Sequence, residues 1–201
     1  MFATVKWETS KEGYVALPRE GSPFFIPMEL VRSEHLSAGQ ELSEEEFLGL
    51  KEKQRRLACR DKALEYLARR EHTAFELRRK LSAKGFEAEQ ISWALGYLEE
   101  RDCLSELRYA RAYIESRQRR NPEGRILLSR RLSAKGVGRE DADRALDEYF
   151  SEEQVTGYVQ KAYSMLAKRY DPEIAILKLQ RKGFSRYEIN RALEDGGDEW
   201  E

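Results

Sequence analysis

The sequence Leu81-Ser82-Ala83-Lys84-Gly85 recurs letter for letter as Leu132-Ser133-Ala134-Lys135-Gly136, and a degenerate third copy stands at Leu179-Gln180-Arg181-Lys182-Gly183. The copies begin 51 and 47 residues apart, and an apolar residue follows the glycine in each. Self-similarity at such a spacing is typical of repeat architectures. The apolar register continues in all three copies, at Ile91, Ala142 and Ile189 and at Ala94-Leu95, Ala145-Leu146 and Ala192-Leu193. We therefore expect one structural unit to be used three times.

Each unit is expected to contain three helices, with the glycine of the repeated element ending the second. Glycine readily adopts the left-handed conformation that closes a helix. A third helix should follow, because apolar residues such as Ile91, Leu95 and Leu98 recur three or four positions apart. Capping boxes are predicted at Ser43–Glu46, Thr73–Glu76, Ser151–Gln154 and Ser185–Glu188. Prolines tolerated in a first turn predict that second helices start at Asn121-Pro122 and Asp171-Pro172.

The predicted fold class is mainly α, with three tandem three-helix repeats in an elongated curved array after a small β-rich N-terminal module. The module is expected to hold two to four strands, because its short aromatic and β-branched runs are bounded by glycine and proline. A helix from about residue 43 is either separated from the next helix near Ala58 or continuous with it. The expected boundaries are 1–42 for the module, 43–57 for a linking helix, 58–103, 104–150 and 151–194 for the repeats, and 195–201 for an acidic tail.

The composition suits a repeat protein with a thin core. Hydrophobic residues make up 40% of the 201 residues and charged residues 36%, which is above the usual quarter. There are 36 basic and 37 acidic residues, which gives a net charge of −1. The chain as a whole therefore lacks the excess of basic residues that is typical of a nucleic-acid-binding domain. The sequence shows no signal-peptide core and no apolar run of membrane-spanning length. We expect a cytoplasmic protein that does not engage a membrane.

Catalytic and metal sites find little support in the sequence. The only histidines, His35 and His72, are far apart in the chain, and Cys59 and Cys103 lack the CxxC spacing of metal or redox sites. Phosphate-binding loops of the GxxxxGK[ST] or GxGxxG type do not occur. We therefore expect no enzyme activity, no cofactor and no metal, with both cysteines as reduced thiols at or near helix packing surfaces.

Basic residues concentrate in the middle of the chain. Eight arginines lie between residues 108 and 131, opposed only by Glu115 and Glu123, so this window carries a local charge of +6. Arginine forms bidentate contacts with carboxylate and phosphate groups, which suits a partner-binding surface. Alternatively, the window is a solvated face balanced in space by Glu99, Glu100, Glu140 and Asp141. The arginines are Arg108, Arg111, Arg117, Arg119, Arg120, Arg125, Arg130 and Arg131.

A second basic group repeats in register with the first. Arg79 and Lys80 stand 51 residues before Arg130 and Arg131, so stacked repeats would place such groups along one side of the array. Tyr109 and Tyr113 lie beside the arginines at helical spacing, where core packing is a better explanation than stacking on bases. The candidate partner-binding or DNA-binding residues are the eight arginines above together with Arg78, Arg79, Lys80 and Lys135.

Several of these segments resemble the RecX regulatory family. Ser105–Tyr113, Gly124–Ile126 and Leu132–Val137 are similar to that family's middle repeat. Ala63–Leu67, Glu76–Leu81 and Gly85-Phe86 are similar to its opening repeat, and the resemblance covers roughly residues 58–194. The N-terminal module is an extension that only some members carry.

The resemblance implies a regulator of DNA recombination, DNA repair and the SOS response rather than an enzyme. RecX proteins are tandem three-helix proteins that bind the filament of the RecA recombinase along its helical groove. There they modulate strand exchange, ATP hydrolysis or filament growth, usually by inhibition. A monomer is expected, with weak contact with single- or double-stranded DNA as a further expectation.

Two alternatives remain open at this point. Leu77–Leu95 could form a helix-turn-helix unit that binds DNA without RecA, although the third helices are acidic and poorly suited to a groove lined by phosphates. The same scaffold could also serve as a structural adaptor for an unrelated helical partner.

Overall fold

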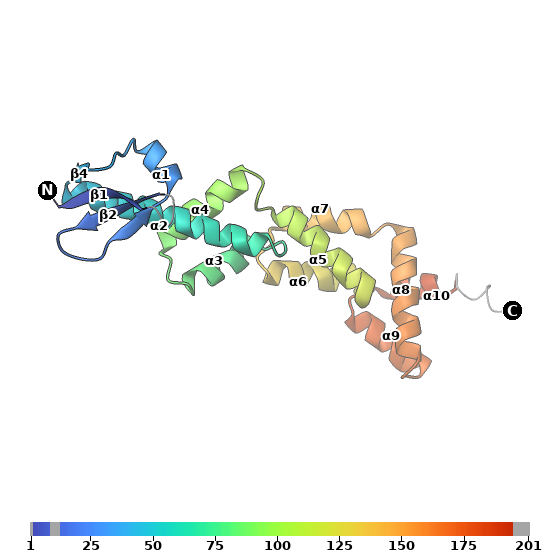
Figure 1. The fold of residues 1–201 in the computed structure, drawn as a ribbon. Coiled ribbons are helices and arrows are strands. Elements are labelled where there is room, and N and C mark those ends of the chain that lie inside the picture. The colour runs from blue at the N-terminus through green and yellow to red at the C-terminus, as the bar shows by residue number, and fades with distance from the viewer. Residues whose placement is uncertain (1, 9–12, 195–201) are drawn as a thin grey trace. The chain divides into compact units, whose positions relative to one another are not determined.

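A computed structural model of the chain describes residues 2–8 and 13–194 (Figure 1). Within these ranges the chain forms ten helices and one small antiparallel sheet near the N-terminus. The predicted fold class, tandem three-helix repeats after a small β-rich module, is confirmed. The acidic tail at 195–201 lies outside the described residues. Among the helices described, none is long and apolar enough to cross a membrane.

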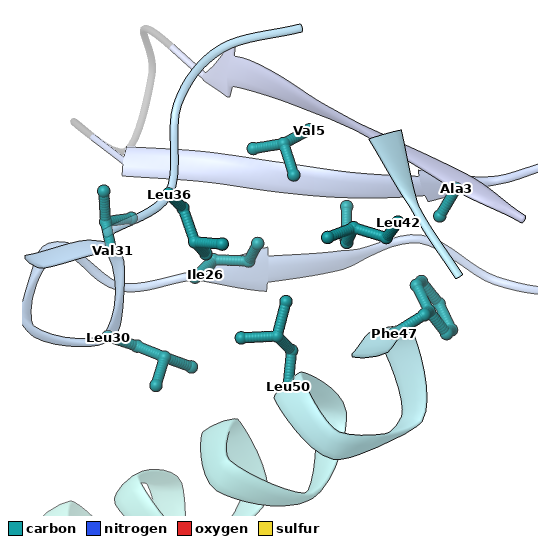
Figure 2. Close-up of a cluster of buried hydrophobic side chains, with 10 residues drawn as sticks. Ala3, Val5, Ile26, Leu30, Val31, Leu36, Leu42, Phe47 and Leu50 are labelled. Carbon is teal, nitrogen blue, oxygen red and sulfur yellow. The ribbon is translucent and has the colours of Figure 1, made fainter. Parts of the chain in front are cut away.

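The N-terminal module is a four-stranded sheet with strand order β3-β2-β1-β4. Its strands are β1 (Ala3–Glu8), β2 (Gly13–Pro18), β3 (Phe24–Ile26) and β4 (Glu41–Leu42). A short helix that the sequence did not predict, α1 (Met28–Ser33), follows β3. In Figure 2 the apolar side chains of the sheet gather over Phe47 and Leu50 of the next helix. The module therefore has its own core, which the first turns of that helix complete.

That helix, α2 (Glu44–Leu67), runs without a break, so the linking helix and the first helix of repeat 1 are one continuous element. No proline interrupts it. Its N-terminus has the predicted capping box, because the Ser43 amide donates to Glu46 Oε2 at 2.7 Å and the Glu46 amide donates to Ser43 Oγ at 3.2 Å. The two capping contacts satisfy amides that the first turn would otherwise leave without partners.

After the N-terminal module, each repeat consists of three helices, and α2 supplies the first helix of repeat 1. Repeat 1 continues with α3 (Ala74–Ser82) and α4 (Ala88–Glu100). In repeat 2, α5 (Glu106–Arg120) and α6 (Arg125–Ala134) both pack against α7 (Arg139–Tyr149). In repeat 3, α9 (Pro172–Arg181) and α10 (Arg186–Glu194) both pack against α8 (Glu152–Ala167) (Figure 1). Repeats 2 and 3 each bury an apolar cluster of their own.

The second helices all end in the same turn. Gly85, Gly136 and Gly183 adopt φ values of +80°, +85° and +91°. In each turn the amide after the glycine donates to the carbonyl five residues earlier, at 3.3 Å from Phe86 to Leu81, 3.1 Å from Val137 to Leu132 and 3.3 Å from Phe184 to Leu179. These bonds define the Schellman closure of a helix. The prediction that these glycines end the helices is confirmed.

The predicted start of α6 at Asn121-Pro122 is wrong, because the helix begins at Arg125 with Gly124 as its N-cap. The Gln118 side chain donates to the Glu123 carbonyl at 2.9 Å and accepts from the Glu123 amide at 3.0 Å. These bonds hold the preceding residues in a loop. In repeat 3 the prediction is confirmed, since Asp171 is the N-cap of α9 and Pro172 its first residue.

The chain divides into two compact units. The first contains the sheet, α2 as far as Glu65, and Lys80–Arg101. The second contains Tyr66–Arg79 and the described residues from Asp102 to Glu194. The first turns of α3 therefore cluster with repeats 2 and 3.

Alanine at Gly136 should destabilise the protein more than alanine at Gly85. Both positions have positive φ, which costs an alanine about 1–2 kcal/mol. A Cβ on Gly136 would also lie 2.5 Å from Cβ of Phe75, whereas a Cβ on Gly85 meets nothing within 4 Å. Urea unfolding of Gly136→Ala and Gly85→Ala measures the difference. Equal losses would contradict a close approach of the Gly136 turn to Phe75.

Candidate functional site

The repeated Lys-Gly turns form contacts between repeats, which decides how many basic side chains remain for a partner. The Thr73 hydroxyl, at the N-terminus of α3, donates to the Lys135 carbonyl at 2.8 Å. Lys135 Nζ donates to Glu76 Oε1 at 3.2 Å. The turn that ends the second helix of repeat 2 thus sits on the start of the second helix of repeat 1.

The turn of repeat 3 makes the equivalent contact with repeat 2. The Gly124 amide, at the N-cap of α6, donates to the Lys182 carbonyl at 2.8 Å. Lys182 Nζ donates to the Pro122 carbonyl at 3.2 Å and also to the Asn121 side-chain oxygen. A Cβ on Gly124 would lie 2.1 Å from the Gly183 carbonyl oxygen, so only glycine fits this approach. Lys135 and Lys182 thus serve the stacking of repeats, so Lys135, one of the predicted binding residues, already has a carboxylate partner within the fold.

Glu76 is the centre of a half-buried charge cluster at the first of these contacts. Its carboxylate accepts from Arg70 Nη1 at 3.0 Å and from the Tyr109 hydroxyl at 3.3 Å, and it lies 3.0 Å from Nδ1 of the buried His72. Burial raises the pKa of Glu76, but hydrogen bonds from Arg70, Lys135 and His72 outweigh it and bring the pKa to about 2. Of the two bonds of the predicted Thr73–Glu76 capping box, the one to Thr73 Oγ1 is present, because this oxygen accepts from the Glu76 amide at 3.0 Å. The sequence did not foresee that the Glu76 carboxylate would join the two repeats.

Most of the predicted arginine stripe is engaged in ion pairs within the chain. Arg111 forms a bidentate pair with Glu148, at 2.7 and 2.5 Å. Arg108 contacts Glu71 at 3.0 Å and Asp102 at 2.7 Å.

The remaining paired arginines lie on α5 and α6. Arg125 Nη2 lies 2.7 Å from Asp147. Arg131 Nε lies 2.8 Å from the buried Glu123, an ion pair without hydrogen-bond geometry. Arg117 also approaches Glu123, at 3.9 Å. The balancing carboxylates are Glu71, Asp102, Glu123, Asp143, Asp147 and Glu148. Carboxylates thus balance five of the eight arginines, as the alternative interpretation expected, but Glu99, Glu100, Glu140 and Asp141 are not among those that pair with them in the described residues.

Five of the twelve candidate residues are exposed and form no ion pair with any described residue. Arg79 and Arg130 occupy equivalent positions in repeats 1 and 2, but the third equivalent position is Leu177, which is 56% exposed. At this position the repetition of charge extends over two repeats, whereas the next position is basic in all three, as Lys80, Arg131 and Lys178. Lys80 is half-buried. The five exposed arginines are Arg78, Arg79, Arg119, Arg120 and Arg130.

The tyrosine pair belongs to the packing of repeat 2. The rings of Tyr109 and Tyr113 stack with their centroids 6.1 Å apart, and Tyr109 is only 5% exposed. The packing interpretation is confirmed for Tyr109, which lies in the core of repeat 2. Among the described residues neither cysteine forms a disulfide, and Cys59 is buried whereas Cys103 is exposed.

A second group of cations, which sequence analysis did not single out, lies in repeat 3. Lys168, Arg169, Lys178 and Lys182 line one hollow at the end of α8. The sequence does carry a signal for them, since residues 161–182 contain six lysines and arginines against two carboxylates.

Comparison with known proteins identifies the family. The model of the first three-helix domain of RecX matches residues 59–98, and that of the second matches residues 105–146. The regulatory protein RecX of Prosthecochloris aestuarii is 34% identical over 139 residues, which cover 67% of this chain and 91% of the relative. The chain belongs to the RecX family. The RecX of Vibrio vulnificus is 30% identical over 148 residues, which cover 69% of this chain and 93% of that protein.

Solved structures agree on the fold. A crystal structure of a regulatory protein RecX superposes with a TM-score of 0.80 over 96% of this chain and 98% of the other, at 20% identity. RecX from Lactobacillus salivarius gives a TM-score of 0.62 over 71% of this chain and 97% of the other, at 23% identity. The first of these matches extends over most of the chain, so it includes the N-terminal module.

Replacing Glu76 by glutamine should reduce the decrease in unfolding free energy that the protein undergoes as the pH is lowered. The depressed pKa of Glu76 means that its contribution is complete above about pH 4.5 and is lost as the pH falls towards about 2. The contribution amounts to at most about 3 kcal/mol. Urea unfolding at pH 6 and at pH 3 should show a larger drop for the native protein than for Glu76→Gln. If the two proteins lose stability in parallel, the Glu76 cluster does not join the repeats as described.

Proposed function

We propose that this chain binds the filament of the RecA recombinase and lowers its ATP hydrolysis and recombination activity. The main support for this proposal is membership of the RecX family. The regulatory protein RecX of Prosthecochloris aestuarii is matched over 91% of its length. Proteins of this family regulate rather than catalyse. We further propose that the protein acts in the cytoplasm as a monomer.

The docking residues that we propose are the five arginines that are exposed and form no ion pair with a described residue, Arg78, Arg79, Arg119, Arg120 and Arg130. An arginine that already holds a carboxylate must break that pair before it can bind another, which reduces the net gain. An exposed, unpaired guanidinium can meet a carboxylate of the filament in a bidentate geometry without that cost. Arg119 and Arg120 end α5, and Arg130 lies on the outer face of α6. We therefore expect Arg119, Arg120 and Arg130 to contribute more to binding than Arg111 or Arg125.

The alternative of a helix-turn-helix protein acting without RecA is less well supported. The helix that would enter a DNA groove in repeat 1 is α4, which exposes Glu89, Glu99 and Glu100. Its counterpart α7 exposes Glu140 and Glu148. Carboxylates on these faces would oppose the phosphates that flank a groove.

Reversing the charge of the unpaired arginines should weaken inhibition of RecA. The native protein, titrated onto preformed filaments of RecA on single-stranded DNA, should reduce ATP hydrolysis. The triple variant Arg119→Glu, Arg120→Glu, Arg130→Glu should need at least about tenfold more protein, because several charged contacts worth about 1 kcal/mol each would be lost. Circular dichroism should show an unchanged helical content.

The matched control is Arg125→Gln, which removes a paired arginine from the same helix as Arg130. Its inhibition curve should stay close to that of the native protein. Inhibition by the triple variant at native concentrations would rule out this docking surface. If the native protein leaves RecA unaffected, the proposed function itself fails.

A further inference from the structure

A hollow at the end of α8 has no role in the function proposed above. It encloses about 420 Å³ and is lined by the four cations Lys168, Arg169, Lys178 and Lys182 together with Tyr170 and Met165. Lys168, Arg169 and Tyr170 lie in the connection from α8 to α9, whereas Lys178 and Lys182 come from α9 and its closing turn. The connection and the helix thus bring separate basic segments to one place.

No carboxylate is among the described residues that line this hollow, so its cations lack an ionic partner there. Among residues 2–8 and 13–194, none of the ion pairs includes any of the four. The arginines of α5 and α6, by contrast, mostly have carboxylate partners. Positive charge without an internal partner is therefore gathered where a ligand can reach it.

Placing cations in this hollow has a desolvation cost, which is visible at Lys182. It is half-buried, and its Nζ donates to neutral oxygens of Asn121 and Pro122. Burial lowers the pKa of Lys182, and the charge of Glu123 offsets only part of that effect. An anion in the hollow would stabilise the charged ammonium group and recover part of the free energy lost by desolvation.

The hollow also offers apolar and aromatic surface. Tyr170 is 40% exposed and Met165 is 43% exposed. Lys178 Nζ lies 4.2 Å from the centroid of the Tyr170 ring, so the ring and the charge are held together. Cations around an exposed aromatic ring are the combination that holds a phosphate and stacks a base. The volume lies within the range of about 300–1,000 Å³ that is usual for small-ligand sites, so one nucleotide fits.

We propose that this hollow binds a nucleotide, with the phosphate between Lys168, Arg169 and Lys178 and the base against Tyr170. The nucleotide is either free or one residue of a single-stranded nucleic acid, since both present the same phosphate and base. An acidic peptide would use the cations but would leave the ring of Tyr170 without a stacking partner. The site does not depend on the proposed action on RecA.

Two probes separate the two sources of nucleotide. Fluorescein-labelled oligothymidylate, followed by fluorescence anisotropy, reports on the polymer, and thymidine monophosphate, followed by ligand-detected NMR, reports on the free nucleotide. Tyr170→Ala and Lys178→Glu should each weaken binding about tenfold, the first through lost stacking and the second through repulsion of the phosphate. Tyr170 is partly exposed on a connecting segment, so its replacement should leave the helical content intact.

Arg181→Glu is the matched control, because Arg181 is an exposed cation of α9 that does not line the hollow. Its affinity should stay within about twofold of the native value. If both probes bind and both variants weaken that binding, the site recognises the nucleotide itself. If only the oligomer binds, and Tyr170 and Lys178 are needed for it, the ligand is the single strand. The proposal is overturned if neither probe binds, if Tyr170→Ala binds normally, or if Arg181→Glu weakens binding as much as Lys178→Glu.

Discussion

The repeats of this protein depend on one kind of contact, in which a Lys-Gly turn rests on the start of a helix in the preceding repeat. The Lys135 carbonyl accepts from Thr73, and the Lys182 carbonyl accepts from the amide of Gly124. Thr73 and Gly124 both precede the first residue of a second helix, but Thr73 donates through its side-chain hydroxyl and Gly124 through its backbone amide. Both contacts satisfy a carbonyl at the end of a helix. Glycine is required because a Cβ would collide with the Phe75 side chain at Gly136 and with the Gly183 backbone at Gly124.

This contact also governs where charge is available. Because Lys135 and Lys182 contact the preceding repeat, two of the three lysines that recur with the sequence period are structural, and the recurrence alone is no evidence of a binding surface. Arg111 and Arg125 form ion pairs with Glu148 and Asp147 of α7. What remains is a small set of arginines that form no ion pair with a described residue and, in repeat 3, a hollow whose cations Lys168, Arg169 and Lys178 form none either. Lys182 also lines this hollow while it contacts the preceding repeat. The net charge of −1 gives no sign of either group of cations, because a sum over the chain does not show which charges are paired in the fold.

Local sequence signals predicted much of the fold. The three glycine turns, the capping boxes at Ser43, Ser151 and Ser185, and the start of α9 at Pro172 all depend on residues close together in the chain. The start of α6 was misplaced because Gln118 and the Lys182 carbonyl hold the preceding loop, and Lys182 is about sixty residues away in sequence. The use of Glu76 and the pairing of Arg111 with Glu148 could not be predicted for the same reason, since spatial neighbours decide them. The site in repeat 3 was missed because its cations are spread over two segments.

The central claim is that pairing within the fold separates structural cations from binding cations, and two nearby residues test it directly. Arg130 is exposed and unpaired among the described residues, whereas Lys135, five residues later, holds Glu76. The measurement compares Arg130→Gln with Lys135→Gln in unfolding free energy and in affinity for RecA filaments. The account predicts that Lys135→Gln loses about 1 kcal/mol of stability and keeps its affinity. Arg130→Gln should keep its stability and bind more weakly. The reverse pattern, or equal effects of both variants on affinity, would contradict the account.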